Sequence, residues 1–245
     1  MLLKDFSLEI EPGTTNAIVG SSGFGKTTLF NLLFRIYAPE SGRILIDDQD
    51  LSDLKFDSFR KYMSMVPQNG ILFNDTIMFN LQYSNPEATD EEIMEVCKQC
   101  EIHEKIMKFK DGYQTKVGDL GSKLSGGERQ RILIARGLLK KDAKIFLFDE
   151  ATSSLDAQTE KQITNRLDKT MAGKTVIYCA HRLSSIINVD KIHVLKQGRV
   201  VEQGTHTELM KRDSEYKNMW RNYLREGTID DVVEEGASSE AQPVL

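Results

Sequence analysis

Residues 20–27 read GSSGFGKT, which places glycines, a lysine and a threonine at the spacing of a phosphate-binding loop. Glycines let successive backbone N–H groups converge on phosphate oxygens. Lys26 adds positive charge for the β- and γ-phosphates, and the Thr27 hydroxyl can bind Mg²⁺. An apolar run, 14–20, precedes the loop, and a run predicted to be helical begins near Lys26, so the dipole of that helix would favour the anion.

This stretch therefore predicts a site for ATP with Mg²⁺. The residues assigned to it here are Gly20, Ser21, Ser22, Gly23, Phe24, Gly25, Lys26, Thr27 and Thr28. The alternative is a glycine-rich turn with a chance lysine, which the strand and helix on either side disfavour. Phe24 is bulky for such a loop, so its side chain is expected to point away from the nucleotide.

Two acids end the apolar run KIFLFDE at residues 144–150. At the end of a buried strand, Asp149 can hold Mg²⁺ through the water shell of the ion. Glu150 would lie near the γ-phosphate, where a carboxylate can act as general base on the attacking water. The pair could instead simply cap the following helix, but a phosphate loop earlier in the chain favours the catalytic reading.

Two more polar side chains follow predicted strands. His181 ends TVIYCAH, residues 175–181, and would emerge at the sheet edge where open α/β sheets bind ligands. It could donate to the γ-phosphate and hold the attacking water together with Glu150. Gln68 ends YMSMVPQ and could reach Mg²⁺ or the water through its amide oxygen. The other histidines, His103, His193 and His206, have no such placement and are interpreted as structural or surface residues.

A second glycine pair stands in LSGGERQR, residues 124–131. Ser125 and Glu128 have the spacing of a capping box at a helix N-terminus. A capping box alone does not require Gly126 and Gly127, each of which costs about 1 kcal/mol in a helix. Glycines there are explained if a ligand must approach the backbone closely, and a helix N-terminus with free N–H groups suits a phosphate.

Composition limits the class of protein. The 245 residues are 40% hydrophobic and 28% charged, which fits one large domain or one domain with an insertion. No apolar run approaches the ~18 residues that span a membrane, and no signal peptide is visible. The net charge is −5, but residues 226–245 hold six acids and no base, so residues 1–225 carry +1. This balance gives no support for nucleic-acid binding.

The three cysteines favour no metal site. Cys97 and Cys100 form a C-x-x-C pair in a run that is predicted to be helical, and no second pair completes a zinc site. Reduced helix cysteines are therefore favoured over metal or redox chemistry. With Cys179 as the third cysteine, a disulfide scaffold is disfavoured, and the domain is expected to face a reducing compartment.

Along the chain, predicted strands alternate with predicted helices. The strands fall at 14–20, 43–49, 62–67, 144–150 and 175–181, followed by a hairpin that turns at Gln197-Gly198. Residues 29–37 predict a helix buried on all sides, and Thr89 predicts an N-cap. The pattern predicts an α/β core with a mostly parallel sheet, a helical subdomain inserted at about 75–141, one domain over 1–225, and a disordered acidic tail at 226–245.

The order GSSGFGKT, VPQ, LSGGERQR, IFLFDE, SSLD, AHR resembles the nucleotide-binding domain of ATP-binding cassette (ABC) proteins, from about Leu2 to Leu209. The resemblance implies a phosphate-loop NTPase fold of RecA-like type with an antiparallel β portion and a helical subdomain. It also implies these roles: Lys26 and Thr27 for phosphate and Mg²⁺, Gln68 and Asp149 at the Mg²⁺ site, Glu150 as general base, Asp156 in the D-loop, and His181 as the switch histidine.

In that family two domains pair head to tail, and each LSGGERQR motif closes on the ATP of the partner. The resemblance therefore implies that Ser125, Gly126, Gly127 and Glu128 contact a nucleotide held by a second nucleotide-binding domain. ATP binding would close the pair, and hydrolysis would release it.

Several stretches resemble the exporters of the family, among them TKVGDLGSKLSGGE, LFNDTI, AHRLS and EQGTHTEL. Asp119 stands where a glutamate is usual. LFNDTI and LSGGERQ most resemble B-subfamily half-transporters, including mitochondrial types linked to iron–sulfur export or heavy-metal tolerance. The implied function is an ATPase that drives transport through membrane-spanning domains, which it would meet near 68–75 and 115–121. The domain, soluble by itself, would lie on the cytosolic or mitochondrial-matrix side of the membrane.

Two other functions compete. A DNA-repair or chromosome ATPase of the same superfamily would carry long coiled coils between the phosphate loop and LSGGERQR, but that interval is only about 100 residues without sustained heptads. A regulatory module without hydrolysis is disfavoured because Glu150 and His181 are both present.

The start of the chain departs from the family pattern. In the family an aromatic residue upstream of VLKD stacks on adenine, whereas the equivalent LLKD begins here at Leu2, and Phe6 is too far along to replace it. The sequence therefore resembles a truncated start. Base stacking is expected to be weaker by about 1–3 kcal/mol, the range for base–aromatic stacking, and ATP affinity with an upstream extension would test this.

Overall fold

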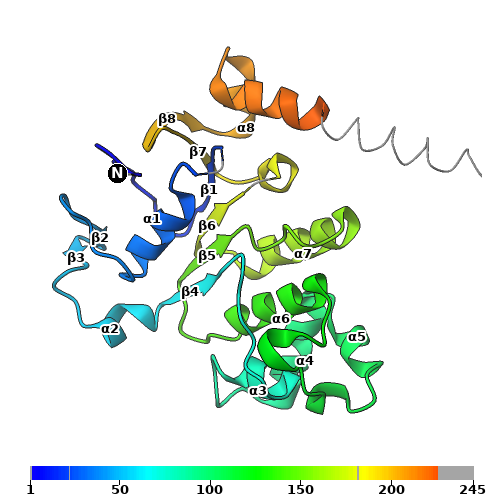
Figure 1. Ribbon diagram of the computed structural model, residues 1–245. Helices are drawn as coiled ribbons and strands as arrows, with labels where there is room; N and C mark the ends of the chain where they lie inside the picture. The colour runs from blue at the N-terminus through cyan, green and yellow to red at the C-terminus, as the bar shows by residue number, and fades with distance from the viewer. Residues whose placement is uncertain (1, 22, 181, 226–245) are drawn as a thin grey trace, which may run out of the picture.

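The computed structural model describes residues 2–21, 23–180 and 182–225, and its centre is a six-stranded sheet in the order β4-β5-β6-β1-β7-β8 (Figure 1). The first five strands are parallel, and β8 pairs antiparallel with β7. The strands are β1 Thr15–Val19, β4 Met63–Val66, β5 Ile145–Asp149, β6 Thr175–Cys179, β7 Lys191–Lys196 and β8 Arg199–Gly204. The predicted α/β fold with a mostly parallel sheet and an antiparallel portion is confirmed.

Helices cover both faces of this sheet. The α-helices are α1 Lys26–Leu33, α2 Phe56–Arg60, α3 Ile77–Gln82, α4 Asp90–Gln99, α5 His103–Met107, α6 Gly126–Leu138, α7 Ala157–Thr170 and α8 His206–Lys211. Residues 215–225 are also helical. Short 3₁₀ helices are η1 Gly112–Gln114, η2 Asp119–Gly121 and η3 Leu183–Ile186, and β2 Leu45–Ile46 pairs with β3 Gln49–Asp50 in a separate two-stranded sheet.

The side chains of β5 show how the two faces are filled. Leu147 packs in a cluster with Leu29 and Phe30 of α1, whereas its neighbours Phe146 and Phe148 pack in a different cluster with residues of α6 and α7. Successive strand residues point to opposite faces of a sheet. Helices α1 and α6 therefore lie on opposite faces, and a continuous apolar strand is the pattern expected when both faces are covered.

Helices α3 to α6 group together at one end of the sheet, in the lower part of Figure 1. They pack mainly on one another, and α6 also contacts β4. This group is the predicted inserted helical subdomain, whose limits at about 75–141 remain a prediction. No helix between the phosphate loop and α6 exceeds ten residues among the described residues, so this part of the structure holds no long coiled coil.

Two local predictions were wrong. The helix expected over 29–37 already ends at Leu33, and Arg35 adopts a left-handed φ of 52°. The guanidinium of Arg35 donates to the carbonyls of Leu51 and Leu54, a contact that fixes this early turn. As a result the side chains that follow, at 36 and 37, are exposed rather than buried. The strand expected at 43–49 is reduced to the two short strands β2 and β3.

Other local signals were read correctly. Thr89 caps α4 in a reciprocal capping box with Glu92. Gln197 and Gly198 both have positive φ, 50° and 77°, as a two-residue hairpin turn with right-handed strand twist requires. Ser22, His181 and the acidic tail at 226–245 lie outside the described residues.

The three cysteines, Cys97, Cys100 and Cys179, are buried free thiols. Burial raises the pKa of Cys97 to about 12 and keeps that of Cys100 well above its ordinary value. Within the described ranges, no group of three or more His, Cys, Asp or Glu side chains is arranged to hold a metal ion. In the same ranges, none of the helices combines the length and the apolar character that crossing a membrane requires.

His193 is buried within β7. Its Nε2 lies 3.0 Å from Oδ1 of Asn16 on the adjacent strand β1, and its Nδ1 has no hydrogen-bond partner. Burial, with a smaller contribution from the positive charge of Lys191, lowers the pKa of His193 to about 4. The neutral imidazole is therefore part of the folded state.

This depressed pKa makes stability depend on pH. The contribution of neutral His193 to the free energy of unfolding is complete above the unfolded-state pKa of about 6.5. It is lost as the pH falls from there toward 4, because in that range only the unfolded chain binds the proton. Between pH 7.5 and 5.5 the free energy of unfolding should fall about 1.4 kcal/mol more in the wild type than in His193→Gln. Urea unfolding at both pH values measures this. An equal fall in the two proteins would contradict it.

Candidate active site

Four parallel strands end at one edge of the sheet and bring the phosphate loop, Gln68, Asp149 and Glu150 together. Gly20 follows β1, Gln68 lies two residues after β4, and Asp149 closes β5, next to Cys179 at the end of β6. The Nε2 of Gln68 donates to Oε2 of Glu150 over 2.6 Å. Two residues 82 positions apart thus meet where parallel α/β sheets bind ligands.

The glycines of the phosphate loop are required by its backbone. Gly23 and Gly25 have φ values of 84° and 95°, which side chains rarely tolerate. A Cβ on Gly20 would lie 2.3 Å from the backbone oxygen of Leu195, so this position has no space for a side chain. Phe24 packs against the apolar cluster on the α1 side of the sheet, which explains how a bulky residue is accommodated in the loop.

Lys26 is buried beneath this loop. Its Nζ donates to the carbonyl oxygen of Gly20 over 2.7 Å and to that of Ser21 over 3.4 Å. Helix α1 begins at Lys26 with no side-chain cap and no acid in its first turn. Its first N–H groups and its dipole therefore present positive potential at the same place as the Lys26 ammonium, an arrangement that suits an anionic phosphate.

Asp149 is only 2% exposed. Burial raises the pKa of its carboxyl group, and the adjacent Glu150 raises it further, whereas the Thr27 hydroxyl and Lys26 oppose the shift. One carboxylate oxygen, Oδ1, has no hydrogen-bond partner. An unsatisfied buried acceptor beside a threonine hydroxyl fits a hydrated Mg²⁺, because oxygen atoms are the ligands that this ion prefers.

Glu150 holds its carboxylate at the sheet edge by an uncommon backbone conformation. Its φ is 47°, in the left-handed region, and its N–H donates to the carbonyl oxygen of Cys179 over 2.9 Å. Strain of this kind in a residue other than glycine costs about 1–3 kcal/mol and occurs preferentially at functional sites. Its carboxylate is partly exposed and is accessible to a substrate.

The second glycine stretch starts a helix. Ser125 is the N-cap of α6, its hydroxyl accepts from the Glu128 N–H over 3.2 Å, and its own N–H donates to the Glu128 carboxylate over 2.9 Å. The predicted capping box is confirmed. Asp156 similarly caps α7 by accepting from the N–H of Thr159. Ser125 and Gly126 are exposed.

Packing within the chain does not explain the two glycines. A Cβ on Gly126 would meet only Ser154, at 3.9 Å, and a Cβ on Gly127 would have ordinary contacts beginning at 3.4 Å. Neither glycine has a positive φ. Helices α1 and α6 lie on opposite faces of the sheet. Among the described residues, no hydrogen bond joins the two glycine stretches, so neither packing nor bonding inside this part of the chain requires Gly126 or Gly127.

The stretches predicted to meet a membrane partner are adjacent. Thr76 and Lys116 form an antiparallel bridge, and the Nδ2 of Asn74 donates to Oδ1 of Asp119. Large apolar side chains are exposed in these stretches and in and just after α3. They are Ile71, Phe73, Phe79, Tyr83 and Leu120, and the rings of Phe73, Phe79 and Tyr83 contact one another.

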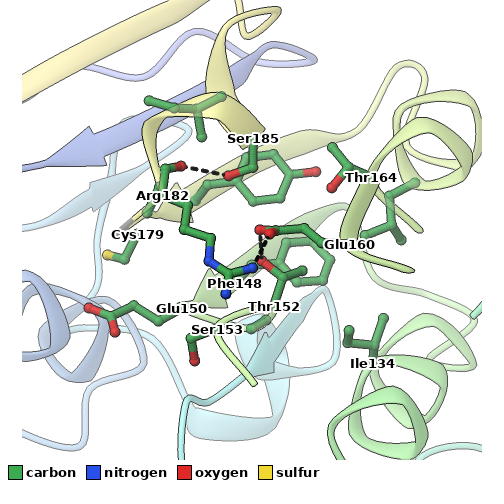
Figure 2. A pocket seen from close by; sticks show the side chains of 15 residues that line it. Ile134, Phe148, Glu150, Thr152, Ser153, Glu160, Thr164, Cys179, Arg182 and Ser185 are labelled. Carbon is green, nitrogen blue, oxygen red and sulfur yellow. Dashed lines mark hydrogen bonds and ion pairs between the residues drawn. The ribbon is translucent and has the colours of Figure 1, made fainter. Parts of the chain in front are cut away.

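One ion pair near the site was given no role in the sequence analysis. Glu160, in the first turn of α7, forms an ion pair with Arg182, just before η3 (Figure 2). Neither residue was predicted to belong to the site. The sequence signal for Arg182 is its place in the AHR motif, directly after His181, whereas Glu160 belongs to no motif named above.

The fold and the arrangement at the sheet edge define an ATPase domain of the phosphate-loop class. A family model described as "ABC transporter" matches residues 3–153. The chain belongs to the ABC transporter family, as the resemblance of its motifs predicted, and it represents the ATPase domain of that family.

Similar proteins refine this placement. ABC transporter aclQ of Aspergillus oryzae is 51% identical over 218 residues, which cover 89% of this chain and 27% of that protein. The heavy metal tolerance protein of Schizosaccharomyces pombe is 49% identical over 220 residues, or 89% of this chain and 26% of the relative. A mitochondrial iron-sulfur clusters transporter of Neurospora crassa is 47% identical over 227 residues, or 90% and 32%.

Among solved structures, a bacterial Atm1-family ABC exporter with ATP bound is 45% identical and superposes with a TM-score of 0.88, covering 91% of this chain and 39% of that chain. The chain thus spans about a quarter to two fifths of these proteins. The predicted resemblance to half-transporters of the heavy-metal and iron–sulfur type is confirmed.

Substitution can separate the roles of Gly126 and Gly137, two of the three glycines in helix α6. Gly126→Ala should leave the free energy of unfolding unchanged or raise it by up to about 1 kcal/mol, because alanine favours helix and the site has space. Gly137→Ala, in the same helix, would place a Cβ 2.7 Å from Val66 and should cost about 1–3 kcal/mol. Urea unfolding of both variants provides the comparison. A loss in Gly126→Ala equal to that in Gly137→Ala would mean that Gly126 serves internal packing.

Proposed function

We propose that this chain binds and hydrolyses Mg-ATP to drive export through the membrane-spanning domains of a transporter. The observation that supports this most strongly is the convergence at one sheet edge of the phosphate loop, the unpartnered oxygen of Asp149 and the Gln68–Glu150 hydrogen bond. Each is a part that ATP hydrolysis requires: an anion cradle, a cation ligand and a base.

The backbone N–H groups of residues 20–28 and the ammonium of Lys26 would bind the phosphates. To do so, Lys26 exchanges its hydrogen bonds with the Gly20 and Ser21 carbonyls for bonds to phosphate oxygens. Thr27, Asp149 and Gln68 are the residues that would hold Mg²⁺, which neutralises charge on the β- and γ-phosphates when bound.

Glu150 accepts a proton from the water that attacks the γ-phosphate, and the products are ADP and phosphate. Its hydrogen bond from Gln68 keeps the carboxylate oriented and couples it to the stretch that follows β4. His181, outside the described residues, is proposed to donate to the γ-phosphate from the segment after β6.

A complete site requires a second nucleotide-binding domain, and we assign the second half of the site to LSGGERQR of that partner. Ser125, Gly126, Gly127 and Glu128 would close on its ATP, with the D-loop residue Asp156 at the same interface. The exposed start of α6 and two glycines without a reason inside the chain support this assignment. An identical partner is the simplest case, because two-fold pairing of like chains creates two equal sites.

The apolar surface around α3 is the proposed contact with the membrane-spanning domains. It lies beside the Asn74–Asp119 link, which joins the stretch after Gln68 to the stretch before Ser125. Movement at either half of the ATP site could reach this surface through a short run of chain. The domain would lie beside the membrane, on the cytosolic or mitochondrial-matrix side. Relatives are named for iron–sulfur clusters and heavy-metal tolerance, and a substrate of that kind is the corresponding proposal here.

Glu150→Gln tests the hydrolytic role. The variant retains shape and hydrogen bonding but lacks the base, so turnover should fall by about 10²–10⁴-fold. With Mg-ATP, it should elute from a sizing column as a dimer and, without nucleotide, as a monomer. Glu95→Gln, an exposed acid on α4, is the matched control and should behave as the wild type.

Wild-type turnover per mole should also rise with protein concentration as dimers form. Turnover that is independent of concentration while the chain remains monomeric would contradict the shared site. Full turnover in Glu150→Gln would contradict the assignment of the base.

A further inference from the structure

The ion pair between Glu160 and Arg182 lies beside the loop at 150–156, the catalytic loop, which joins β5 to α7 and begins with the proposed base Glu150 (Figure 2). Nη1 of Arg182 is 2.5 Å from Oε2 of Glu160, and the side chain of Glu160 is only 7% exposed. The second carboxylate oxygen, Oε1, accepts from the Thr152 hydroxyl over 2.7 Å. Both oxygens of a buried acid are thus satisfied by a cation and a hydroxyl, which is the condition for keeping such a charge inside a protein.

Arg182 also holds the backbone of the loop. The same Nη1 donates to the carbonyl oxygen of Leu155 over 3.0 Å. Leu155 precedes Asp156, the N-cap of α7, and its own N–H donates to the carbonyl oxygen of Thr152. One guanidinium therefore contacts the start of α7 and the end of the loop between β5 and α7.

The location of this link connects two parts of the proposed site, the 150–156 loop and the segment after β6. Thr152 is two residues after the proposed base, Glu150, and Ser153 donates its N–H to the carbonyl oxygen of Glu150. Arg182 directly follows the proposed switch histidine at the exit of β6. The loop at 150–156 and the segment after β6 are thus fastened to each other through side chains as well as through the backbone bond from Glu150 to Cys179.

We propose that Glu160 and Arg182 are positioning residues, which hold the 150–156 loop and the segment after β6 in one arrangement. The proposal rests on the proposed ATPase function of this site. Among the described residues, no hydrogen bond joins the pair to the phosphate loop, so it acts on the placement of Glu150 and Asp156 and not on nucleotide affinity. Its loss lowers kcat and leaves ATP binding to the phosphate loop unchanged.

A pair that serves only stability would behave differently, and three variants separate the two roles. Glu160→Gln keeps the shape and removes the charge. Arg182→Gln breaks the link but leaves Glu160 buried without a cation, so it risks misfolding. The double variant Glu160→Gln/Arg182→Gln removes that buried charge and regains stability, whereas the bond to the Leu155 carbonyl is still missing.

A matched control exists on the same helix. Arg166 of α7 forms a 2.5 Å ion pair with Glu101, which lies just after α4 and not in the 150–156 loop. The control variant is therefore Glu101→Gln/Arg166→Gln. It removes a pair of similar geometry from α7 without touching residues 150–156.

The experiment measures three quantities on the whole chain: amide hydrogen exchange of residues 153–156 without nucleotide, ATP affinity, and kcat. In Glu160→Gln/Arg182→Gln, amide exchange in the loop should become faster and kcat should fall, each by about tenfold or more. This is the size of effect expected when one charge-assisted hydrogen bond is lost. ATP affinity should remain within about twofold of the wild type. The control pair should leave all three quantities unchanged.

Two results would overturn the proposal: wild-type exchange and kcat in a stable double variant, or an equal loss in the control pair. The exchange measurement uses the nucleotide-free chain, so it tests the link even if the wild type had no ATPase activity. If the wild type shows no turnover while loop exchange is faster in the double variant, the proposed ATPase function is refuted. If the wild type turns over ATP normally while loop exchange in the double variant is unchanged, the positioning role is refuted.

Discussion

The parallel pairing of strands is the constraint on which the rest of this structure depends. Because β4, β5, β6 and β1 run in the same direction, all four end at one edge, and the residues that follow them share a small volume. The Gln68–Glu150 hydrogen bond is the direct result. Helices on both faces bury the sheet, which in turn permits the apolar strands that place an acid such as Asp149 in a dry environment.

The same architecture explains why one domain has two glycine-rich stretches with different requirements. Gly20 and Gly25 are fixed by the backbone of their own chain, through a close carbonyl and a positive φ. Gly126 has space around it and ordinary helical geometry. The first stretch is therefore constrained by its own chain, whereas the second leaves a helix N-terminus exposed, as the proposed contact with a partner requires. The backbone requires glycine in the first stretch but not in the second. This difference supports a site shared between two domains more directly than the presence of the LSGGERQR motif does.

Much of the fold and of the candidate site could be predicted, because the signals are local. Apolar runs marked β1, β5 and β6, and the capping residues Thr89 and Ser125 marked helix starts. The errors came from long-range contacts. Arg35 ends α1 early through carbonyls 16 and 19 residues away, and Glu160 meets Arg182 across 22 positions. The hydrophobic periodicity of the sequence does not indicate such contacts, because only the folded sheet brings the partners together.

Complementation between two defective chains tests the shared site most directly. Lys26→Ala impairs the phosphate loop, and Gly126→Asp places a negative charge at a helix N-terminus, which stabilises the helix but repels a phosphate. Each variant alone should lack turnover. An equal mixture should recover up to about a quarter of wild-type turnover, because half of the random dimers are mixed and one of their two sites is intact. A mixture as inactive as its components, although it dimerises, would contradict the account.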